Sequence, residues 1–236
     1  MPSPIKVLHR RDGMGYCLGK KWSFCVPEDQ VVLMDIENNA YVMLPPSLGA
    51  SFERLRKQEP LDCGDVSYLE ALVRAGIIEQ QEAEGSITHC SLPVAPERGF
   101  DEQDLASWSV RDMALAILAL GKTRHALHQC SFAEILAEIR DAKCRADATV
   151  AGSEDRRARE IASAFYRMNA YVTRYDQCLL RSLAMIRCLL ANRVPADLMF
   201  GVATRPFRAH CWVQHRDLVL NDTLEGIRNY TPILVI

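Results

Sequence analysis

Residues 178–191 carry apolar side chains at the spacing of an amphipathic helix. Arg181 and Arg187 lie off the apolar stripe, so the predicted helix has one broad hydrophobic face and one polar face. Asp176 is suited to cap this helix, which would place Cys178 in its first turn. The stripe consists of Leu179, Ala184, Met185, Ile186, Leu189 and Leu190.

Strand-like patterns follow this helix, because apolar and β-branched side chains alternate with other residues in three short segments. These predicted strands span residues 198–203, 210–214 and 218–222. Only three residues separate the last two segments, so we expect a hairpin with His215 exposed in its turn. If the two strands pair in register, Asp222 returns beside His210.

Helical periodicity also marks three segments before residue 178, and they span residues 110–120, 132–139 and 154–172. Residues 141–152 are predicted to form a loop between the last two. We expect these helices to cover the sheet as scaffold.

The N-terminal part of the chain has a different pattern, with three short strands predicted at residues 22–26, 31–36 and 40–44. Ser47 follows two prolines and is predicted to cap a helix that carries Phe52 on its apolar face. A second helix is expected over residues 65–75 and should end at Gly76. Strands followed by helices in so short a segment indicate a small α+β domain.

Residues 81–104 interrupt this periodicity with proline, glycine and acidic side chains. Such composition is typical of a linker. The chain is therefore predicted to be an α+β protein with an N-terminal domain over residues 1–80 and a larger domain over residues 105–236.

Composition narrows the function classes. The formal net charge is −2, which gives no electrostatic basis for nucleic-acid binding. No apolar run reaches 18 residues, and the first residues lack the apolar core of a signal peptide, so we expect a cytoplasmic protein without membrane partners. With 49% hydrophobic residues, the chain can bury a sizeable core.

The nine cysteines are scattered and form no C-x-x-C pair, which favours free thiols in a reducing compartment over disulfides or zinc. His125 and His128 lack a third ligand at a suitable spacing, so no metal site is predicted. Gly121-Lys122-Thr123 is not a phosphate loop, because Ala116 occupies the position that requires glycine. We therefore recognise no nucleotide or other cofactor site.

Cys178, His210 and Asp222 follow the order of a thiol nucleophile, its general base and the group that orients the base. The start of a helix favours thiolate, and its free N–H groups can stabilise an oxyanion. The N–H of Cys178 is one candidate donor, and the side chain of Gln177 is another. The alternative is a packed thiol, since free cysteines are commonly buried.

The segments C-L-L-R-S-L-A-M, F-G-V, F-R-A-H-C-W-V-Q and L-V-L-N-D resemble the leader peptidase (B protein) of lasso-peptide biosynthesis. That family is similar to transglutaminases and papain-like cysteine proteases. The resemblance covers most of residues 105–236 and implies Cys178 as nucleophile, His210 as base and Asp222 as orienting group. Asn221 is a rival for the last role, because papain-like enzymes use asparagine there. Cys211 stands where the family usually has alanine.

The N-terminal segments V-V-L-M-D-I-E-N-N-A-Y-V-M-L and L-x-x-L-V-R-A-G-I-I-E, with P-x-x-x-x-x-F between them, resemble the RiPP recognition element. This winged-helix-like domain holds leader peptides in precursor-modifying enzymes. The resemblance implies that a leader adds as a strand beside the third strand and packs on the last helix. The candidate contacts are Tyr41, Met43, Leu69, Leu72 and Arg74, although Leu69 and Leu72 also suit the core.

Together the two resemblances imply a cysteine endopeptidase that removes the leader from a lasso precursor during antimicrobial peptide maturation. The implied partners are the precursor leader, with threonine at its penultimate position, and an asparagine-synthetase-like cyclase that closes the macrolactam. ATP dependence of the pathway stays open. Two alternatives remain: a transglutaminase or acyltransferase, in which an amine resolves the thioester, and a non-catalytic chaperone that delivers a peptide to the synthetase.

Overall fold

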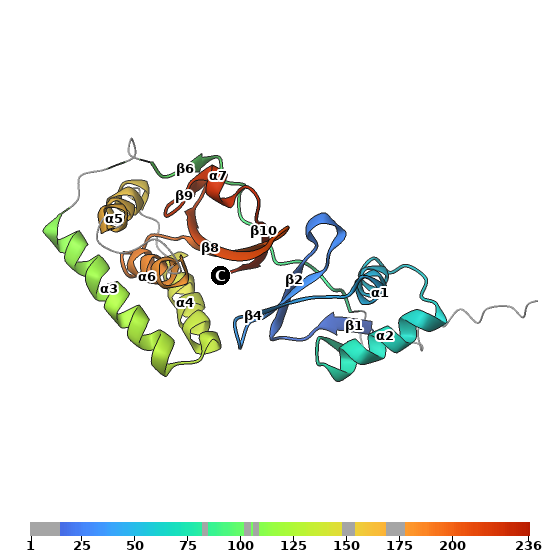
Figure 1. Cartoon of the computed structure of the whole chain (residues 1–236). Coiled ribbons are helices and arrows are strands. Elements are labelled where there is room, and N and C mark those ends of the chain that lie inside the picture. Colours follow the sequence, from blue (N-terminus) through green and yellow to red (C-terminus); the bar gives the residue numbers. More distant parts are fainter. Residues whose placement is uncertain (1–14, 82–84, 102–104, 106–108, 148–153, 169–177) are drawn as a thin grey trace, which may run out of the picture. The chain divides into compact units, whose positions relative to one another are not determined.

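The computed structural model of the protein describes residues 15–81, 85–101, 105, 109–147, 154–168 and 178–236. The chain divides into two compact units, and the division falls between Cys90 and Ser91. This boundary lies inside the segment 81–104 that the sequence indicated as a linker. Both units combine helices with strands, so the predicted α+β class is confirmed (Figure 1).

The first unit contains an antiparallel sheet in the order β2-β3-β4. Its strands match the three predicted ones to within two residues at each end, and they lie beside two helices (Figure 1). A further pair, β1 with β5, was not predicted. The bounds are β1 Gly15–Leu18, β2 Trp22–Cys25, β3 Val32–Asp35, β4 Ala40–Met43 and β5 Ile78–Gln81.

Two helices complete the first unit, α1 at Pro46–Arg56 and α2 at Cys63–Arg74. The predicted Ser47 cap is wrong: Pro45 is the N-cap, and its apolar side chain makes no capping hydrogen bond. Pro46 takes the first helical position, where the N–H that proline lacks would have no partner inside the helix. Helix α2 begins earlier than expected, since Asp62 and Asp65 form a reciprocal capping box. Gly76 follows α2 with φ +65°, as its terminating role requires.

The core of the first unit lies between its sheet and these helices. Leu69 and Leu72 of α2 are 3% and 1% exposed, and both belong to the buried cluster that also contains Phe24 and Phe52. Fully burying a leucine side chain stabilises a fold by about 1.5–3 kcal/mol. The expectation that Leu69 and Leu72 touch a bound leader is therefore corrected, because these side chains support the fold from inside.

The second unit is built on a five-stranded sheet in the order β10-β7-β8-β9-β6. The pairs are antiparallel except for β6 with β9, which is parallel. Strand β8 is longer than predicted, whereas β9 ends earlier, and β6 lies inside the segment taken as a linker. The bounds are β6 Arg98–Gly99, β7 Asp197–Thr204, β8 Phe207–His215, β9 Leu218–Val219 and β10 Thr231–Val235.

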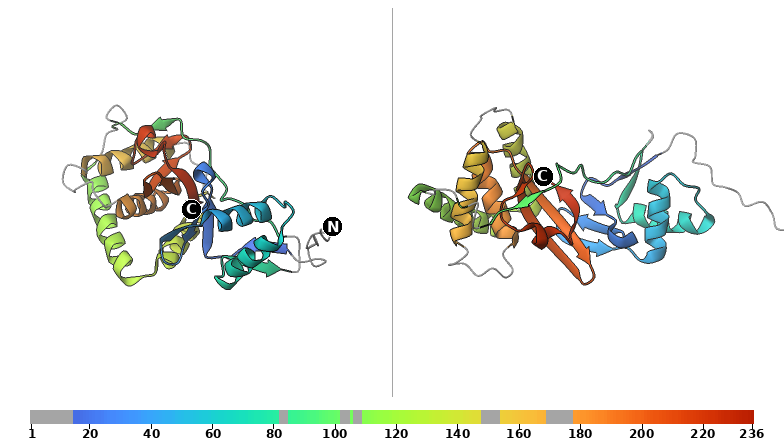
Figure 2. Two further views of the ribbon diagram at one scale, coloured as in Figure 1. Left: turned by 45° about the vertical axis from the view of Figure 1, so that its right-hand side comes forward. Right: turned by 90° about the horizontal axis from the view of Figure 1, so that it is seen from above.

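Helix α6 (Cys178–Ala191) lies on this sheet, mainly against β8, and three further helices pack around it (Figures 1 and 2). Of the predicted apolar stripe, Ala184, Met185, Ile186, Leu189 and Leu190 are buried, whereas Leu179 in the first turn is only partly buried. The surrounding helices are α3 Val110–Gln129, α4 Phe132–Asp147 and α5 Glu154–Met168; a short α7, Leu224–Ile227, follows β9. No helix within the described ranges combines the length and apolar character needed to span a bilayer.

Two predictions for the second unit are corrected. Residues from Asp141 to Asp147 are helical and extend α4, while the rest of the expected loop, like the expected end of α5 at residue 172, lies outside the described residues. His215 is buried rather than exposed, with 3% of its surface accessible. Its ring nitrogens contact the Pro195 carbonyl at 2.5 Å and Asp155 Oδ1 at 2.9 Å, so its polar atoms are satisfied inside the fold.

Candidate functional site

Helix α6 begins at Cys178 and presents its first turns to β8. Ser182 lies four residues further on, hence on the same side of the helix as Cys178. Its hydroxyl donates to the Cys211 carbonyl at 3.0 Å. This bond fixes the start of α6 against the middle of β8. Asp176 and Gln177, the predicted cap and the candidate oxyanion donor, lie outside the described residues.

His210 on β8 and Asp222 after β9 form a direct pair, with 2.6 Å between Nε2 and Oδ2. The backbone N–H of Thr223 donates to the other carboxylate oxygen at 2.7 Å, which orients the group. Gly226 leaves room for it, since a Cβ atom at that position would lie 2.1 Å from Asp222 Oδ1. The turn into α7 therefore holds Asp222 against the imidazole.

Aromatic side chains surround the His210 ring. The Trp212 ring is stacked at 22° with centroids 6.1 Å apart, and the Tyr230 ring lies 5.1 Å away. Gly201 on β7 lacks the Cβ atom that would come within 2.9 Å of Trp212 and 3.0 Å of Tyr230. As the alternation predicted, His210 and Trp212 share one face of β8. These contacts restrict the imidazole to the orientation that Asp222 accepts.

Cys178, His210 and Asp222 line one pocket of about 340 Å³. The structure thus brings the three predicted residues together from the start of α6, from β8 and from the segment after β9. Phe100 and Tyr166 add aromatic surface to the lining. Further lining residues are Arg181, Met185, Cys211, Leu220, Asn221 and Thr223.

The electrostatics of this pocket favour a charged thiolate–imidazolium pair. Hydrogen bonds with the Cys211 thiol and then with His210 lower the pKa of Cys178 to about 4, despite opposition from burial. Burial opposes the charge on His210, but hydrogen bonds and negative charge from Asp222 and Cys178 outweigh it and raise the pKa of His210 to about 9. At neutral pH, sulfur 178 is therefore charged and able to attack an electrophile.

Asn221, the rival orienting residue, makes different contacts. Its Oδ1 accepts the N–H of Val213 at 2.8 Å, and its Nδ2 donates to the Ser182 hydroxyl at 2.8 Å. It ties the segment after β9 to β8 and α6. Of these two candidates, Asp222 is the one that hydrogen-bonds to the His210 ring.

Cys211 is the site residue whose contact sequence reasoning missed. It is 3% exposed, and its hydrogen bond with Cys178, followed by burial, raises the pKa of the Cys211 thiol well above its usual range. Its position directly after His210 on a strand that faces the helix start was the available signal. Trp212, Tyr230 and Gly226 were also missed, because their roles depend on packing between distant segments.

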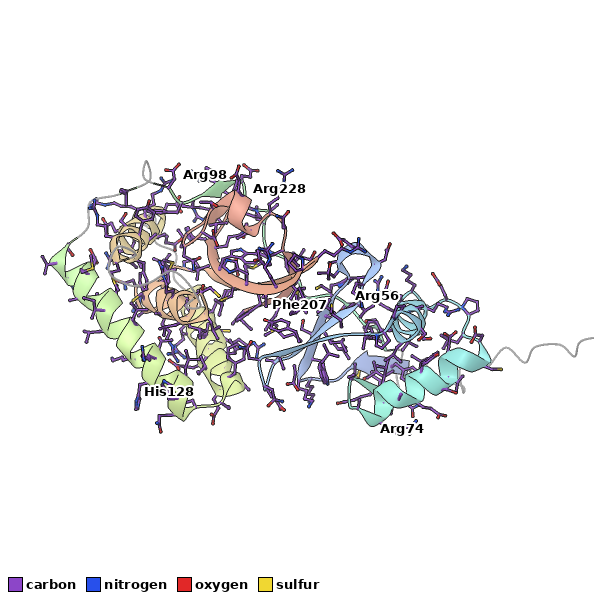
Figure 3. The ribbon with its side chains drawn as sticks, in the orientation of Figure 1. Arg56, Arg74, Arg98, His128, Phe207 and Arg228 are labelled. Carbon is purple, nitrogen blue, oxygen red and sulfur yellow. The ribbon has the colours of Figure 1, made fainter. Side chains whose placement is uncertain are left out.

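The candidate leader contacts lie in the first unit. Tyr41 and Met43 are on β4, one of the two edge strands of the three-stranded sheet, and Met43 is 47% exposed. Arg74 is exposed on α2 and projects away from that helix (Figure 3). These three remain at the surface, unlike the two leucines of α2.

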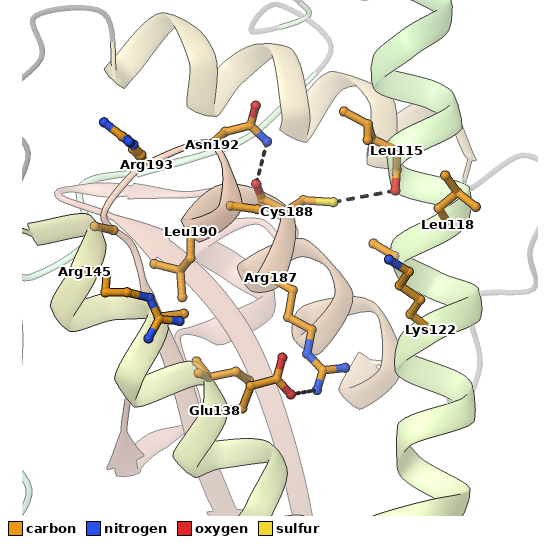
Figure 4. A pocket seen from close by; sticks show the side chains of 15 residues that line it. Leu115, Leu118, Lys122, Glu138, Arg145, Arg187, Cys188, Leu190, Asn192 and Arg193 are labelled. Carbon is orange, nitrogen blue, oxygen red and sulfur yellow. Dashed lines mark hydrogen bonds and ion pairs between the residues drawn. The ribbon is translucent and has the colours of Figure 1, made fainter.

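A larger cavity, of about 890 Å³, opens between α3, α4 and α6 (Figure 4). It contains Cys188, whose thiol donates to the Leu115 carbonyl at 3.8 Å. Burial raises the pKa of Cys188 to about 11, so this sulfur is not a nucleophile at neutral pH. The cation Arg187 is paired with Glu138 at 2.6 Å. Size alone therefore does not identify the reactive site.

Within the described ranges, no group of three or more His, Cys, Asp or Glu side chains has the arrangement to hold a metal ion. All nine cysteines are free thiols.

Comparison with known proteins agrees with this geometry. Residues 120–235 match the model of the transglutaminase-like superfamily, and the match includes Cys178, His210 and Asp222. No curated protein and no solved structure gave a significant match. Members of the superfamily are usually cysteine-dependent enzymes, either proteases or transglutaminases. Residues 120–235 of this chain are thus similar to the transglutaminase-like superfamily, in line with the helices packed on a mainly antiparallel sheet in the second unit.

Proposed function

We propose that this protein is the leader peptidase of a lasso-peptide (RiPP) pathway, which binds the precursor leader through its first unit and cuts the leader–core bond in its second. One observation carries the proposal. Cys178, His210 and Asp222 come from three separate elements and line one pocket, with the imidazole and the carboxylate 2.6 Å apart. That arrangement suits a thiol endopeptidase.

The reaction begins when the Cys178 thiolate attacks the carbonyl carbon of the scissile peptide bond. The resulting oxyanion faces the first turn of α6, where backbone N–H groups are free to donate. The His210 imidazolium then gives its proton to the departing amine of the core peptide, which leaves a thioester between Cys178 and the leader.

Water completes the cycle. Neutral His210 takes a proton from the water that attacks the thioester, and the leader leaves as a carboxylic acid while Cys178 returns to thiolate. Asp222 is hydrogen-bonded to Nε2 of His210, so the opposite ring nitrogen, Nδ1, exchanges protons with the sulfur and the water. The negative charge of Asp222 also stabilises the imidazolium.

Leader binding is supported by the edge of the first unit's sheet. Strand β4 has only β3 as a neighbour among the described strands, and its apolar side chains Val42 and Met43 are 42% and 47% exposed. An extended peptide can pair with such an edge through backbone hydrogen bonds and place alternate side chains on its surface.

Docking on one unit and cleavage in another make the reaction intramolecular. A short flexible tether gives an effective concentration of order millimolar, well above that of a free peptide. The core peptide with its new amine would pass to the partner cyclase, an asparagine-synthetase-like macrolactam synthetase.

Incubation with the precursor encoded by a short reading frame beside this gene tests the proposal, with the products weighed by mass spectrometry. We expect two fragments whose masses sum to that of the precursor plus water. Cys178→Ala should abolish cleavage and keep precursor binding, whereas Cys144→Ala, which removes an exposed thiol on α4, should cleave normally. A precursor joined to an amine would instead indicate acyl transfer. Cleavage by Cys178→Ala at the wild-type rate would refute the thiol mechanism.

A further inference from the structure

Cys178 shares its pocket with a second thiol, Cys211, that takes no covalent part in the peptidase reaction. Cys178 and Cys211 both line the cavity, and their side chains are hydrogen-bonded to each other. Ser182, one turn after Cys178 on α6, donates to the Cys211 carbonyl at 3.0 Å and so holds the start of α6 against the part of β8 that carries Cys211. A reactive sulfur and a protonated thiol are thus held together by the fold.

A thiolate next to a protonated thiol can be oxidised by hydroperoxides to a disulfide. An activated thiolate in an accessible pocket reacts with hydroperoxides to give a sulfenic acid, and without a nearby thiol the oxidation continues to sulfinic acid, which thiol reductants do not reverse. A neighbouring thiol stops this progression by condensing with the sulfenic acid.

We propose that Cys178 and Cys211 form an oxidation site for hydroperoxides, in which Cys178 is oxidised first and Cys211 then closes a disulfide between α6 and β8. The disulfide removes the nucleophile reversibly, so the protein is inactive under oxidising conditions and recovers after reduction. The loss of activity rests on the proposed peptidase function; the disulfide itself does not.

Oxidation of Cys178 and closure of the disulfide balance in atoms and electrons. Cys178 thiolate attacks one oxygen of hydrogen peroxide and breaks the O–O bond, which gives Cys178 sulfenic acid and hydroxide. The Cys211 sulfur then attacks the Cys178 sulfur, and the sulfenic oxygen leaves with the Cys211 proton and its own proton as water. Two electrons pass from the thiol pair to peroxide, which is the named oxidant.

The first unit offers an internal control. Burial, and after it the proximity of Cys90, raises the pKa of Cys25 to about 12, and burial also raises the pKa of Cys90. These two thiols are also near each other, but neither is ionised at neutral pH. Proximity without an activated sulfur should therefore leave them reduced at low peroxide concentration.

The experiment treats the full chain with a small molar excess of hydrogen peroxide, blocks the remaining thiols, and maps tryptic peptides by mass spectrometry. Cys178 lies in the peptide 175–181 and Cys211 in the peptide 209–216. We expect these two joined, with a loss of two hydrogens that dithiothreitol restores. Peptides 22–54 and 75–98, which carry Cys25 and Cys90, should remain separate and blocked.

Cys211→Ala and Cys211→Ser should change the product to Cys178 sulfinic acid, which dithiothreitol does not reverse; the second variant nearly keeps the volume of the buried side chain. Sulfinic acid at Cys178 in the wild-type protein, or a joined pair no more abundant than Cys25 with Cys90, would overturn the proposal. Peptide masses report the disulfide whether or not the protein cleaves a precursor, so the two proposals fail separately.

Discussion

The imidazole of His210 and the carboxylate of Asp222 lie 2.6 Å apart, although they do not face each other in a continuous strand ladder. Strand β9 ends at Val219, and the chain bends before it reaches Asp222. The Thr223 N–H and the missing Cβ of Gly226 place the carboxylate. The pair therefore depends on the turn into α7 as much as on the hairpin.

Asp222→Asn tests this pair. The amide keeps the shape of the side chain but loses the charge that raises the pKa of His210, so imidazolium is less stable and the ring orientation is less defined. We expect kcat for precursor cleavage to fall by about 10²- to 10⁴-fold, the range attributed to general acid–base catalysis. Thermal unfolding should change little. Steady-state kinetics and calorimetry on the same sample measure both.

Asn221→Ala should lower the stability of the fold more than the rate of cleavage, the reverse of what we expect for Asp222→Asn. Its removal leaves the Val213 N–H and the buried Ser182 hydroxyl each without one partner. A buried polar group that loses its partner costs about 1–3 kcal/mol of the free energy of unfolding. We expect a lower melting temperature with kcat reduced far less than in Asp222→Asn. If Asn221→Ala instead lost activity at unchanged stability, Asn221 would be the orienting residue.

Local patterns were enough to predict most elements of both units. The apolar stripe of α6 and the alternation in β7 and β8 were read from period alone, although residues 198–203 of β7 and 211–215 of β8 are buried on both faces of the sheet. The ends of helices were harder to predict from the sequence. Asp62 caps α2 through a bond to Asp65, and α4 continues past residue 141, because capping partners and packing decide these boundaries.

The site was predictable for the residues whose chemistry is distinctive. A cysteine at a helix start, a histidine on a strand and an aspartate after the next strand gave the three pocket residues. The exposure of His215 could not be predicted, because its partners Pro195 and Asp155 are 20 and 60 residues away. The same holds for Leu69 and Leu72, since an apolar helix residue near a proposed groove is equally suited to the core.

The pH dependence of Cys178 alkylation follows from its surroundings. The pKa of Cys178 is lowered to about 4, so its thiolate is present above that pH, and the pKa of His210 is raised to about 9, so imidazolium persists below that pH. We expect the iodoacetamide rate of Cys178 to be nearly flat from pH 5 to 8. Free cysteine, with a pKa of about 8.5, should react about tenfold faster per pH unit over most of that range.

The shape of the curve is the diagnostic, because a less basic thiolate is also a weaker nucleophile. Peptide mapping at each pH separates Cys178 from the exposed Cys63, Cys130 and Cys144. Precursor cleavage needs both charges and should therefore fall below about pH 4 and above about pH 9. A rate at Cys178 that climbs with pH like that of free cysteine would exclude the ion pair.

The edge of β4 can be blocked without breaking its pairing to β3. The Leu44 N–H donates to the Val31 carbonyl at 3.0 Å, so alternation turns the N–H of Met43 away from β3 and toward the free edge. Met43→Pro removes that outward donor, and proline is tolerated on edge strands. We expect KM for the full precursor to rise at least about tenfold, since the leader loses its tether, while kcat is kept. Cleavage of a short peptide that spans only the leader–core junction should not change.

Val42→Pro serves as the matched control. The N–H of Val42 faces β3, so losing this donor should destabilise the first unit in thermal unfolding. Equal effects of Met43→Pro on the full precursor and on the short peptide would place leader recognition elsewhere than on this strand.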